Sequence, residues 1–98
     1  MDIIFEVIDY TGRKIRLTKK QWSHIMKRHP YMIKYIEEIK ETLKKPQKIT
    51  SYSLDSHIRY YYRNYQNLVS PNRYILIIVK YLNNHGFVIS TYRVSNIR

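Results

Sequence analysis

Histidine and arginine are the side chains of this chain best suited to chemistry, namely proton transfer beside a phosphate group. The 98-residue sequence has 4 His and 18 Lys or Arg against 7 Asp or Glu, a formal net charge of +11, and no Cys. Histidine transfers protons near neutral pH without a metal, because its ordinary pKa is about 6.5. Arginine holds phosphate oxygens with a planar fork, and lysine acts as a point charge. A hard divalent cation needs several oxygen ligands, so a chain so poor in carboxylates suits metal-free chemistry.

Two long stretches of the sequence contain no acidic residue. Residues 10–36 carry eight Lys or Arg with His24 and His29, and residues 56–98 carry six Lys or Arg with seven Tyr. Such stretches attract polyanions, and tyrosine rings stack on unpaired bases. Metal-free cleavage by a general acid and base suits RNA, whose 2′-hydroxyl supplies the nucleophile. The sequence therefore predicts RNA as the partner, with no cofactor and no metal site.

The first half of the chain is expected to form a hairpin followed by two helices. Residues 3–17 read as two strands around a turn at Gly12, and Thr18 with Gln21 forms a capping-box pattern at a helix start. That helix places Trp22, Ile25, Met26 and His29 on one face. Pro30 predicts a break or sharp kink before a second helix at about residues 31–44.

After Pro46 the apolar pattern changes to a period of two, which is typical of strands. The expected strands are residues 48–53, 57–65, 73–82 and 87–93. The predicted fold is α+β: an N-terminal β-hairpin and two helices, kinked at Pro30, packed on one face of a four-stranded antiparallel sheet. Residues 1–98 are interpreted as a single domain.

Alternation along the strands divides their side chains between two faces. Arg59, Tyr61 and Arg63 face one way, and we expect Lys80 to join them together with either the Thr91 set or the Tyr92 set of the last strand. No acidic residue follows Arg59 and Arg63 in the sequence, so this cation pair is interpreted as a phosphate site. The catalytic candidates are His29, His24, Arg59, Lys80, Thr91 and Tyr92, and the candidate RNA contacts are Tyr61, Arg63, Lys27, Arg28 and Arg93.

Each candidate also has a structural interpretation. His24 suits the solvated surface of its helix, and His29 suits a cap or a hydrogen bond within the core. Thr91 suits a strand because of its β-branch, and the run Tyr60-Tyr61-Tyr62 has high strand propensity. The sequence alone leaves open which histidine acts in catalysis.

Several short motifs follow one another along the chain: Leu17-Thr18-Lys19-Lys20-Gln21-Trp22-Ser23-His24-Ile25, Arg28-His29-Pro30, Lys45-Pro46, Arg59-Tyr60-Tyr61, Val79-Lys80 and Ser90-Thr91-Tyr92. This order resembles small nuclease-like domains of phages and mobile elements, which are grouped with the barnase, EndoU, colicin and RelE-like RNases. The resemblance spans about residues 14 to 95. It implies helices before a four-stranded antiparallel sheet, metal-independent RNA cleavage, and polar site positions at His29, Arg59 and Thr91.

The first functional hypothesis is an RNA endonuclease of toxin or mobile-element type that cleaves through the 2′-hydroxyl. The alternatives are a non-catalytic nucleic-acid-binding module, and an interaction domain for an acidic partner such as an antitoxin or immunity protein. No apolar run approaches the 18 residues of a membrane span, and the N-terminus lacks the basic start of a secretory signal. A soluble, cytoplasmic protein without membrane contact is therefore expected, and the sequence does not predict its oligomeric state.

Overall fold

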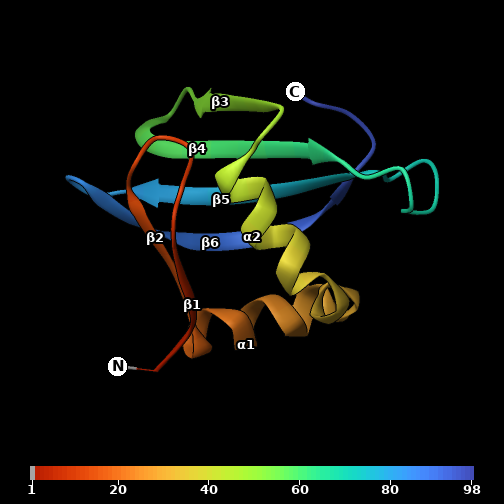
Figure 1. Ribbon diagram of the computed structural model, residues 1–98, viewed down its shortest axis with the longest axis horizontal. Coiled ribbons are helices and arrows are strands. Elements are labelled where there is room, and N and C mark those ends of the chain that lie inside the picture. Colours follow the sequence, from red (N-terminus) through yellow and green to blue (C-terminus); the bar gives the residue numbers. More distant parts are fainter. Residues whose placement is uncertain (1) are drawn as a thin grey trace.

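A six-stranded mixed sheet forms the body of the protein, with its helices gathered on one side (Figure 1). The computed structural model describes residues 2–98. The elements are β1 (Ile3–Ile8), β2 (Lys14–Thr18), α1 (Lys19–Arg28), the 3-10 helix η1 (Pro30–Tyr35), α2 (Ile36–Lys44), β3 (Lys48–Tyr52), β4 (Asp55–Asn64), β5 (Tyr74–Tyr81) and β6 (His85–Val94). The strand order across the sheet is β1-β2-β6-β5-β4-β3.

The expected four-stranded antiparallel sheet is wrong, because the N-terminal hairpin belongs to the same sheet. β1 and β2 pair antiparallel as a hairpin, but β2 also pairs with β6, and this pairing is parallel. Pairing with β6 along the second edge of β2 is favoured because it buries Ile15 and Leu17 completely, and these two side chains extend the core. Gly86 of β6 permits the close approach, since a Cβ there would lie 2.6 Å from the Lys80 carbonyl oxygen and 3.1 Å from Ile15 Cδ1.

The helix starts and stops follow the predicted local signals. The Thr18 hydroxyl accepts a hydrogen bond from the Gln21 backbone N–H at 3.1 Å, which confirms Thr18 as the cap of α1. The predicted break at His29-Pro30 is also present, since α1 ends at Arg28 and His29 has non-helical dihedrals. Pro30 opens the 3-10 helix η1, and α2 begins only at Ile36, so the helix expected over residues 31–44 is two segments.

The two faces of the sheet differ in what covers them. The helix-covered face carries Tyr61, Ile75, Ile77, Val79 and Val88, which pack with Met32, Ile39 and Leu43 of the helical segments in one buried cluster. The opposite face, called here the outer face, carries Tyr60 and Tyr62 of β4, Leu76 and Ile78 of β5, and Ser90 and Tyr92 of β6, as the strand register requires. After β6 the chain turns back toward β3 (Figure 1).

The helix α1 lies beside β6 where β2 leaves it. The pairing of β2 with β6 ends at Arg16 and Phe87. Beyond that point the Gln21 side-chain amide donates to the backbone carbonyl of Ile89, which ties α1 to β6. Within residues 2–98, no helix has both the length and the apolar character needed to cross a bilayer.

Candidate active site

A groove of about 360 Å³ runs between α1 and β6. Its walls are Gln21, His24, Ile25 and Arg28 from α1, with Ile89 and Ser90 from β6. The four helical residues fall at i, i+3, i+4 and i+7, so the helical period places them on one face. His24 and Arg28 are exposed, so both polar groups are accessible to a ligand in the groove.

His29 lies at the end of α1 with its ring held in place. Its backbone N–H donates to the Ile25 carbonyl at 2.7 Å, and its own carbonyl accepts from Met32 at 3.0 Å. The imidazole stacks on the Tyr92 ring, with centroids 4.9 Å apart and planes at 23°, and meets Tyr31 edge-on at 6.0 Å. Tyr92 follows Ser90 by two residues on the same strand face, and His29 follows Arg28 directly in the chain, so the pair of rings comes next after the groove residues on both elements.

Among residues 2–98, no carboxylate lines this groove. Several acidic side chains are instead engaged elsewhere: Glu6 with Arg16 at 3.1 Å, Glu37 with Lys40 at 3.3 Å, Glu41 with Arg63 at 3.7 Å, and Asp55 with Lys80 at 3.5 Å. Across the described residues 2–98, no group of three or more His, Cys, Asp or Glu is arranged to hold a metal ion. The groove therefore presents His24 and Arg28 to an anion, with no acidic side chain among its walls.

The expectation that Arg59 and Lys80 share a face is wrong. Lys80 pairs across the strands with Ile58, whereas Arg59 pairs with Val79, so the two cations point to opposite sides of the sheet. Arg59 donates to the backbone carbonyls of Ser56 and Ile58, and its guanidinium lies 5.2 Å from the centre of the Tyr81 ring. Lys80 sits on the outer face beside Asp55, and the Lys80 ammonium and His57 N–H groups lower the pKa of that carboxyl, the backbone N–H of His57 most of all.

Tyr61 and Thr91 lie inside the protein. Tyr61 has no exposed surface, and its hydroxyl donates to the carboxylate of Asp9 while lying 2.6 Å from the Tyr81 hydroxyl. Burial, followed by the hydrogen bonds to Asp9 and Tyr81, raises the pKa of Tyr61. The Thr91 hydroxyl is fully buried and donates to the Leu76 carbonyl at 2.8 Å. Of the two alternatives on β6, only Tyr92 shares a face with Lys80.

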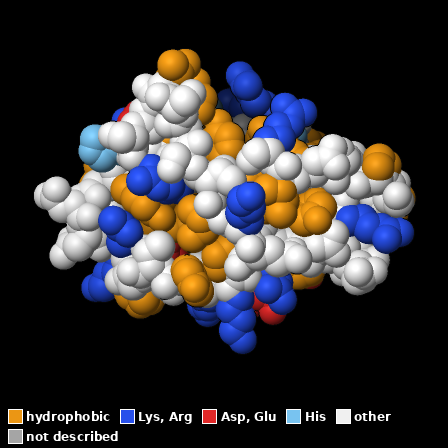
Figure 2. Space-filling model, turned by 90° about the horizontal axis from the view of Figure 1, so that it is seen from above, with side chains coloured by type: hydrophobic (Ala, Val, Ile, Leu, Met, Phe, Trp, Pro, Cys, Tyr) orange, Lys and Arg blue, Asp and Glu red, His pale blue; other side chains and the backbone are white. Residues whose placement is uncertain are grey.

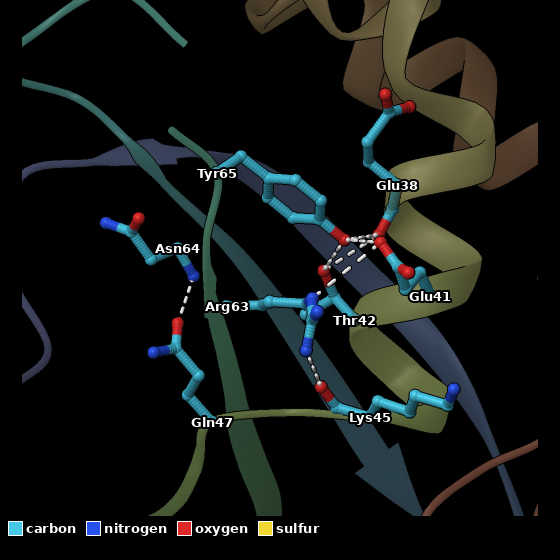
Figure 3. A network of polar contacts seen from close by, with 8 residues as sticks. All are labelled: Glu38, Glu41, Thr42, Lys45, Gln47, Arg63, Asn64 and Tyr65. Carbon is cyan, nitrogen blue, oxygen red and sulfur yellow. Dashed lines mark hydrogen bonds and ion pairs between the residues drawn. The ribbon is translucent and has the colours of Figure 1, made fainter. Parts of the chain in front are cut away.

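Arg63 belongs to a polar network that joins α2 to the end of β4 (Figure 3). Its guanidinium donates to the Lys45 carbonyl at 2.8 Å and lies 3.7 Å from Glu41, so the interpretation of an unneutralised cation is wrong for Arg63. The Tyr65 hydroxyl also donates to Glu41 at 2.7 Å. Burial raises the pKa of Tyr65 to about 12.

Two further candidates lie away from the groove walls. Arg93 donates through Nε to the Asn72 carbonyl at 2.9 Å and through a terminal nitrogen to the Val69 carbonyl at 2.8 Å, which ties down the loop between β4 and β5. Lys27 is exposed on α1 but does not line the groove. Of the candidates predicted from sequence, the structure therefore brings together two pairs: His24 and Arg28 in the groove, and His29 with Tyr92 next to the end of α1.

Sequence reasoning missed the two other polar wall residues of the groove, Gln21 and Ser90. The spacing of Gln21, His24 and Arg28 is a polar helical stripe and could have identified Gln21. Strand alternation places Ser90 on the same face as Tyr92, but it left open which face of this strand joins the site.

Comparisons with known proteins give no relative: no family model matches the chain, and no curated protein or solved structure is significantly similar to it.

Proposed function

We propose that the protein is a metal-independent ribonuclease whose active site is the groove between α1 and β6, extended by His29 and Tyr92. One observation carries this proposal: His24 and Arg28 line a groove without carboxylates, and His29 is held beside it by the Tyr92 ring. Cleavage by the 2′-hydroxyl needs a base, an acid and a cation beside the phosphate, and two imidazoles and a guanidinium can supply them.

In this mechanism one of the two histidines, neutral, removes the proton from the 2′-hydroxyl of the RNA. The 2′-oxygen attacks the adjacent phosphorus, and the bond from phosphorus to the 5′-oxygen of the next nucleotide breaks. The other histidine, protonated, gives its proton to that leaving oxygen. The products are a 2′,3′-cyclic phosphate and a free 5′-hydroxyl, and DNA, without the 2′-hydroxyl, is bound and left intact.

Arg28 suits the phosphate itself. It lies one helical turn beyond His24 on the same face of α1, so both can reach one ligand in the groove. A guanidinium fork contacts two non-bridging oxygens and stabilises the charge that develops on them in the phosphorane. Tyr92 orients the His29 ring by stacking on it, which limits the directions in which that imidazole can exchange a proton.

The resemblance of the sequence to the barnase, EndoU, colicin and RelE-like RNases supports the same proposal, since one of the polar positions it implies is His29. The positions it implies at Arg59 and Thr91 are not part of the mechanism, because both side chains are engaged with backbone carbonyls on the other side of the sheet.

The test is incubation of purified protein with single-stranded RNA in EDTA, followed by mapping of the ends. Cleavage with 2′,3′-cyclic phosphate ends is expected, and His29→Gln, His24→Ala and Arg28→Ala should each lower the rate about a hundredfold or more. Matched controls are His57→Ala, whose imidazole is 64% exposed beside Asp55, and Lys44→Ala on α2, both of which should keep the full rate.

Full activity in the His24→Ala/His29→Gln double variant would refute the assignment of the site. RNA binding without any cleavage by the unaltered protein would refute the enzymatic proposal and favour the non-catalytic binding module instead.

A further inference from the structure

The outer face of the sheet contains a small hollow that is separate from the groove but shares Tyr92 with its extension. The hollow measures about 240 Å³ and is lined by Tyr60, Tyr62, Leu76, Tyr92, Val94, Asn96 and Arg98. We propose that it binds one unpaired nucleobase of the RNA, with adenine preferred, and so selects the nucleotide presented to His29. This inference rests on the proposed function for its substrate class, and its test is independent of cleavage.

The aromatic character of the hollow follows from the strand register. Tyr62, Leu76 and Tyr92 lie opposite one another on β4, β5 and β6, and Tyr60 is two residues before Tyr62 on the same face. Tyr62 and Leu76 are 1% and 4% exposed, whereas Tyr60 and Tyr92 are only half-buried. Each half-buried ring has one stacked neighbour, Tyr52 for Tyr60 and His29 for Tyr92, so the other ring face is the one on which a base, whatever its identity, can stack.

Tyr60 lies within a group of phenol side chains. Its ring stacks with that of Tyr52 of β3, with centroids 6.0 Å apart and planes at 17°. Burial raises the pKa of Tyr60, and the neighbouring phenols of Tyr52, Tyr92 and Tyr62 raise it further. Tyr60 therefore stays neutral at working pH and adds no negative charge against a phosphate.

Charge favours a nucleotide over an apolar peptide in this hollow. Arg98 is part of its lining, Lys48 pairs across the strands with Tyr62 beside it, and none of the lining residues is acidic. Figure 2 views the protein from the side of β3 and residues 95–98, where hydrophobic side chains lie between Lys and Arg and few acidic atoms are visible. An aromatic hollow with a cationic rim suits a base with its attached phosphate.

Asn96 gives the hollow a means of choosing among bases. An asparagine amide offers one donor and one acceptor side by side, which match N7 and the N6 amino group of adenine. The Asn96 amide donates a long hydrogen bond of 3.3 Å to the Ser95 hydroxyl and lies at an exposed position, so it is accessible.

Tyr92 connects this hollow to the candidate active site. It lines the hollow and also stacks on the His29 imidazole at 4.9 Å. A base held against Tyr92 therefore has its ribose near His29, which is the geometry needed for attack by the 2′-hydroxyl of that same nucleotide. Cleavage is expected on the 3′ side of adenosine.

The test uses short single-stranded DNA oligomers, which lack the 2′-hydroxyl and cannot be cleaved by this mechanism. Fluorescence anisotropy should give an oligo-deoxyadenosine affinity several-fold higher than that of oligo-deoxythymidine. Tyr60→Leu, which keeps an apolar strand residue but removes the ring, should weaken binding of both about tenfold. Asn96→Ala should remove the preference for deoxyadenosine, and Arg98→Ala should weaken both oligomers equally.

The matched controls are Tyr10→Leu, which changes a tyrosine that is 70% exposed on the β1–β2 turn, and Arg73→Ala, an exposed arginine before β5. Neither should change the affinities. Equal binding of the two oligomers by the unaltered protein, or unchanged binding in both Asn96→Ala and Arg98→Ala, would overturn the nucleobase site.

The two proposals fail separately. A protein that cleaves RNA through His29 without any preference between the oligomers refutes the hollow and leaves the ribonuclease standing. A protein that prefers oligo-deoxyadenosine but never cleaves RNA refutes the ribonuclease and retains the base site.

Discussion

Replacement of Tyr61 by Phe separates a structural role for this residue from a role in RNA contact. The Tyr61 hydroxyl has a single proton, which it donates to Asp9, so in the contact between the two phenols Tyr81 must be the donor. A chain of hydrogen bonds thus runs from Tyr81 through Tyr61 to Asp9. Asp9 is 5% exposed, and its other carboxylate oxygen accepts from the Thr11 and Arg13 backbone N–H groups at 2.9 and 3.0 Å. The chain therefore fastens the β1–β2 turn to the middle of the sheet.

The cost of Tyr61→Phe follows from the two contacts that it removes. A hydrogen bond to a charged acceptor contributes about 1.5–3 kcal/mol, and one between neutral groups about 1 kcal/mol. Tyr61→Phe should therefore lower the free energy of unfolding by about 2.5–4 kcal/mol, which corresponds to a Tm lower by about 10–30 °C in a chain of this size. Tyr81→Phe removes only the neutral bond and should lower the Tm by about 5 °C.

Thermal and urea unfolding followed by circular dichroism measure these changes, with the exposed Tyr10→Phe as a control that should leave the Tm unchanged. In the double variant, Tyr81→Phe should add almost nothing, because Tyr61→Phe has already removed the acceptor of the Tyr81 hydroxyl. Below their Tm all variants should cleave and bind RNA as the unaltered protein does. Strictly additive losses in the double variant, or a selective loss of RNA affinity in Tyr61→Phe, would refute this reasoning.

Two further predictions concern alkaline pH and glycine. Burial holds the pKa of Tyr65 at about 12 and also raises that of Tyr61, whereas in the unfolded chain both tyrosines ionise near 10.0. The free energy of unfolding should therefore be at its full value below pH 10 and fall as the pH rises toward 12. A urea midpoint that stays constant over that range would contradict this prediction. Gly86→Ala should lower the Tm, at a cost of about 1–3 kcal/mol, because the new Cβ would lie 2.6 Å from the Lys80 carbonyl oxygen. In Gly12→Ala the new Cβ would meet open space, so the only cost of this variant should be the backbone strain of its φ of +89°, about 1–2 kcal/mol. A Gly86→Ala protein as stable as the parent would exclude the close contact at Gly86.

Local features of the fold could be predicted from the sequence because they depend on neighbouring residues. The cap at Thr18, the break at Pro30 and the alternation in the strands each rest on a few adjacent side chains and on the period of helix or strand. The parallel pairing of β2 with β6 could not be predicted in this way. Alternation shows that residues 14–17 form a strand, but it carries no information on which distant strand lies beside it.

The candidate site could be predicted only where its residues are neighbours in the sequence, because the sequence does not show contacts between distant segments. His24 and Arg28 share one face of α1 and His29 directly follows that helix, so the sequence itself keeps these three residues within a short segment. Arg63 and Tyr61 had looked available because the acids that contact them, Glu41 and Asp9, lie far away in the sequence. A residue that looks available for binding therefore has a structural role when its partner lies far away in the sequence, and only the tertiary structure shows that partner.

Because the walls of the groove come from α1 and β6, the groove is completed only late in the synthesis of the chain. The ribosome makes α1 early and β6 long afterwards, and β6 must then enter the sheet between β2 and β5. Pairing between such distant segments forms late and slowly, since the loop that it closes is long. Until β6 docks, a nascent chain therefore carries His24 and Arg28 on a short segment without an opposing wall, and the proposed activity is withheld from the RNA of the translating ribosome.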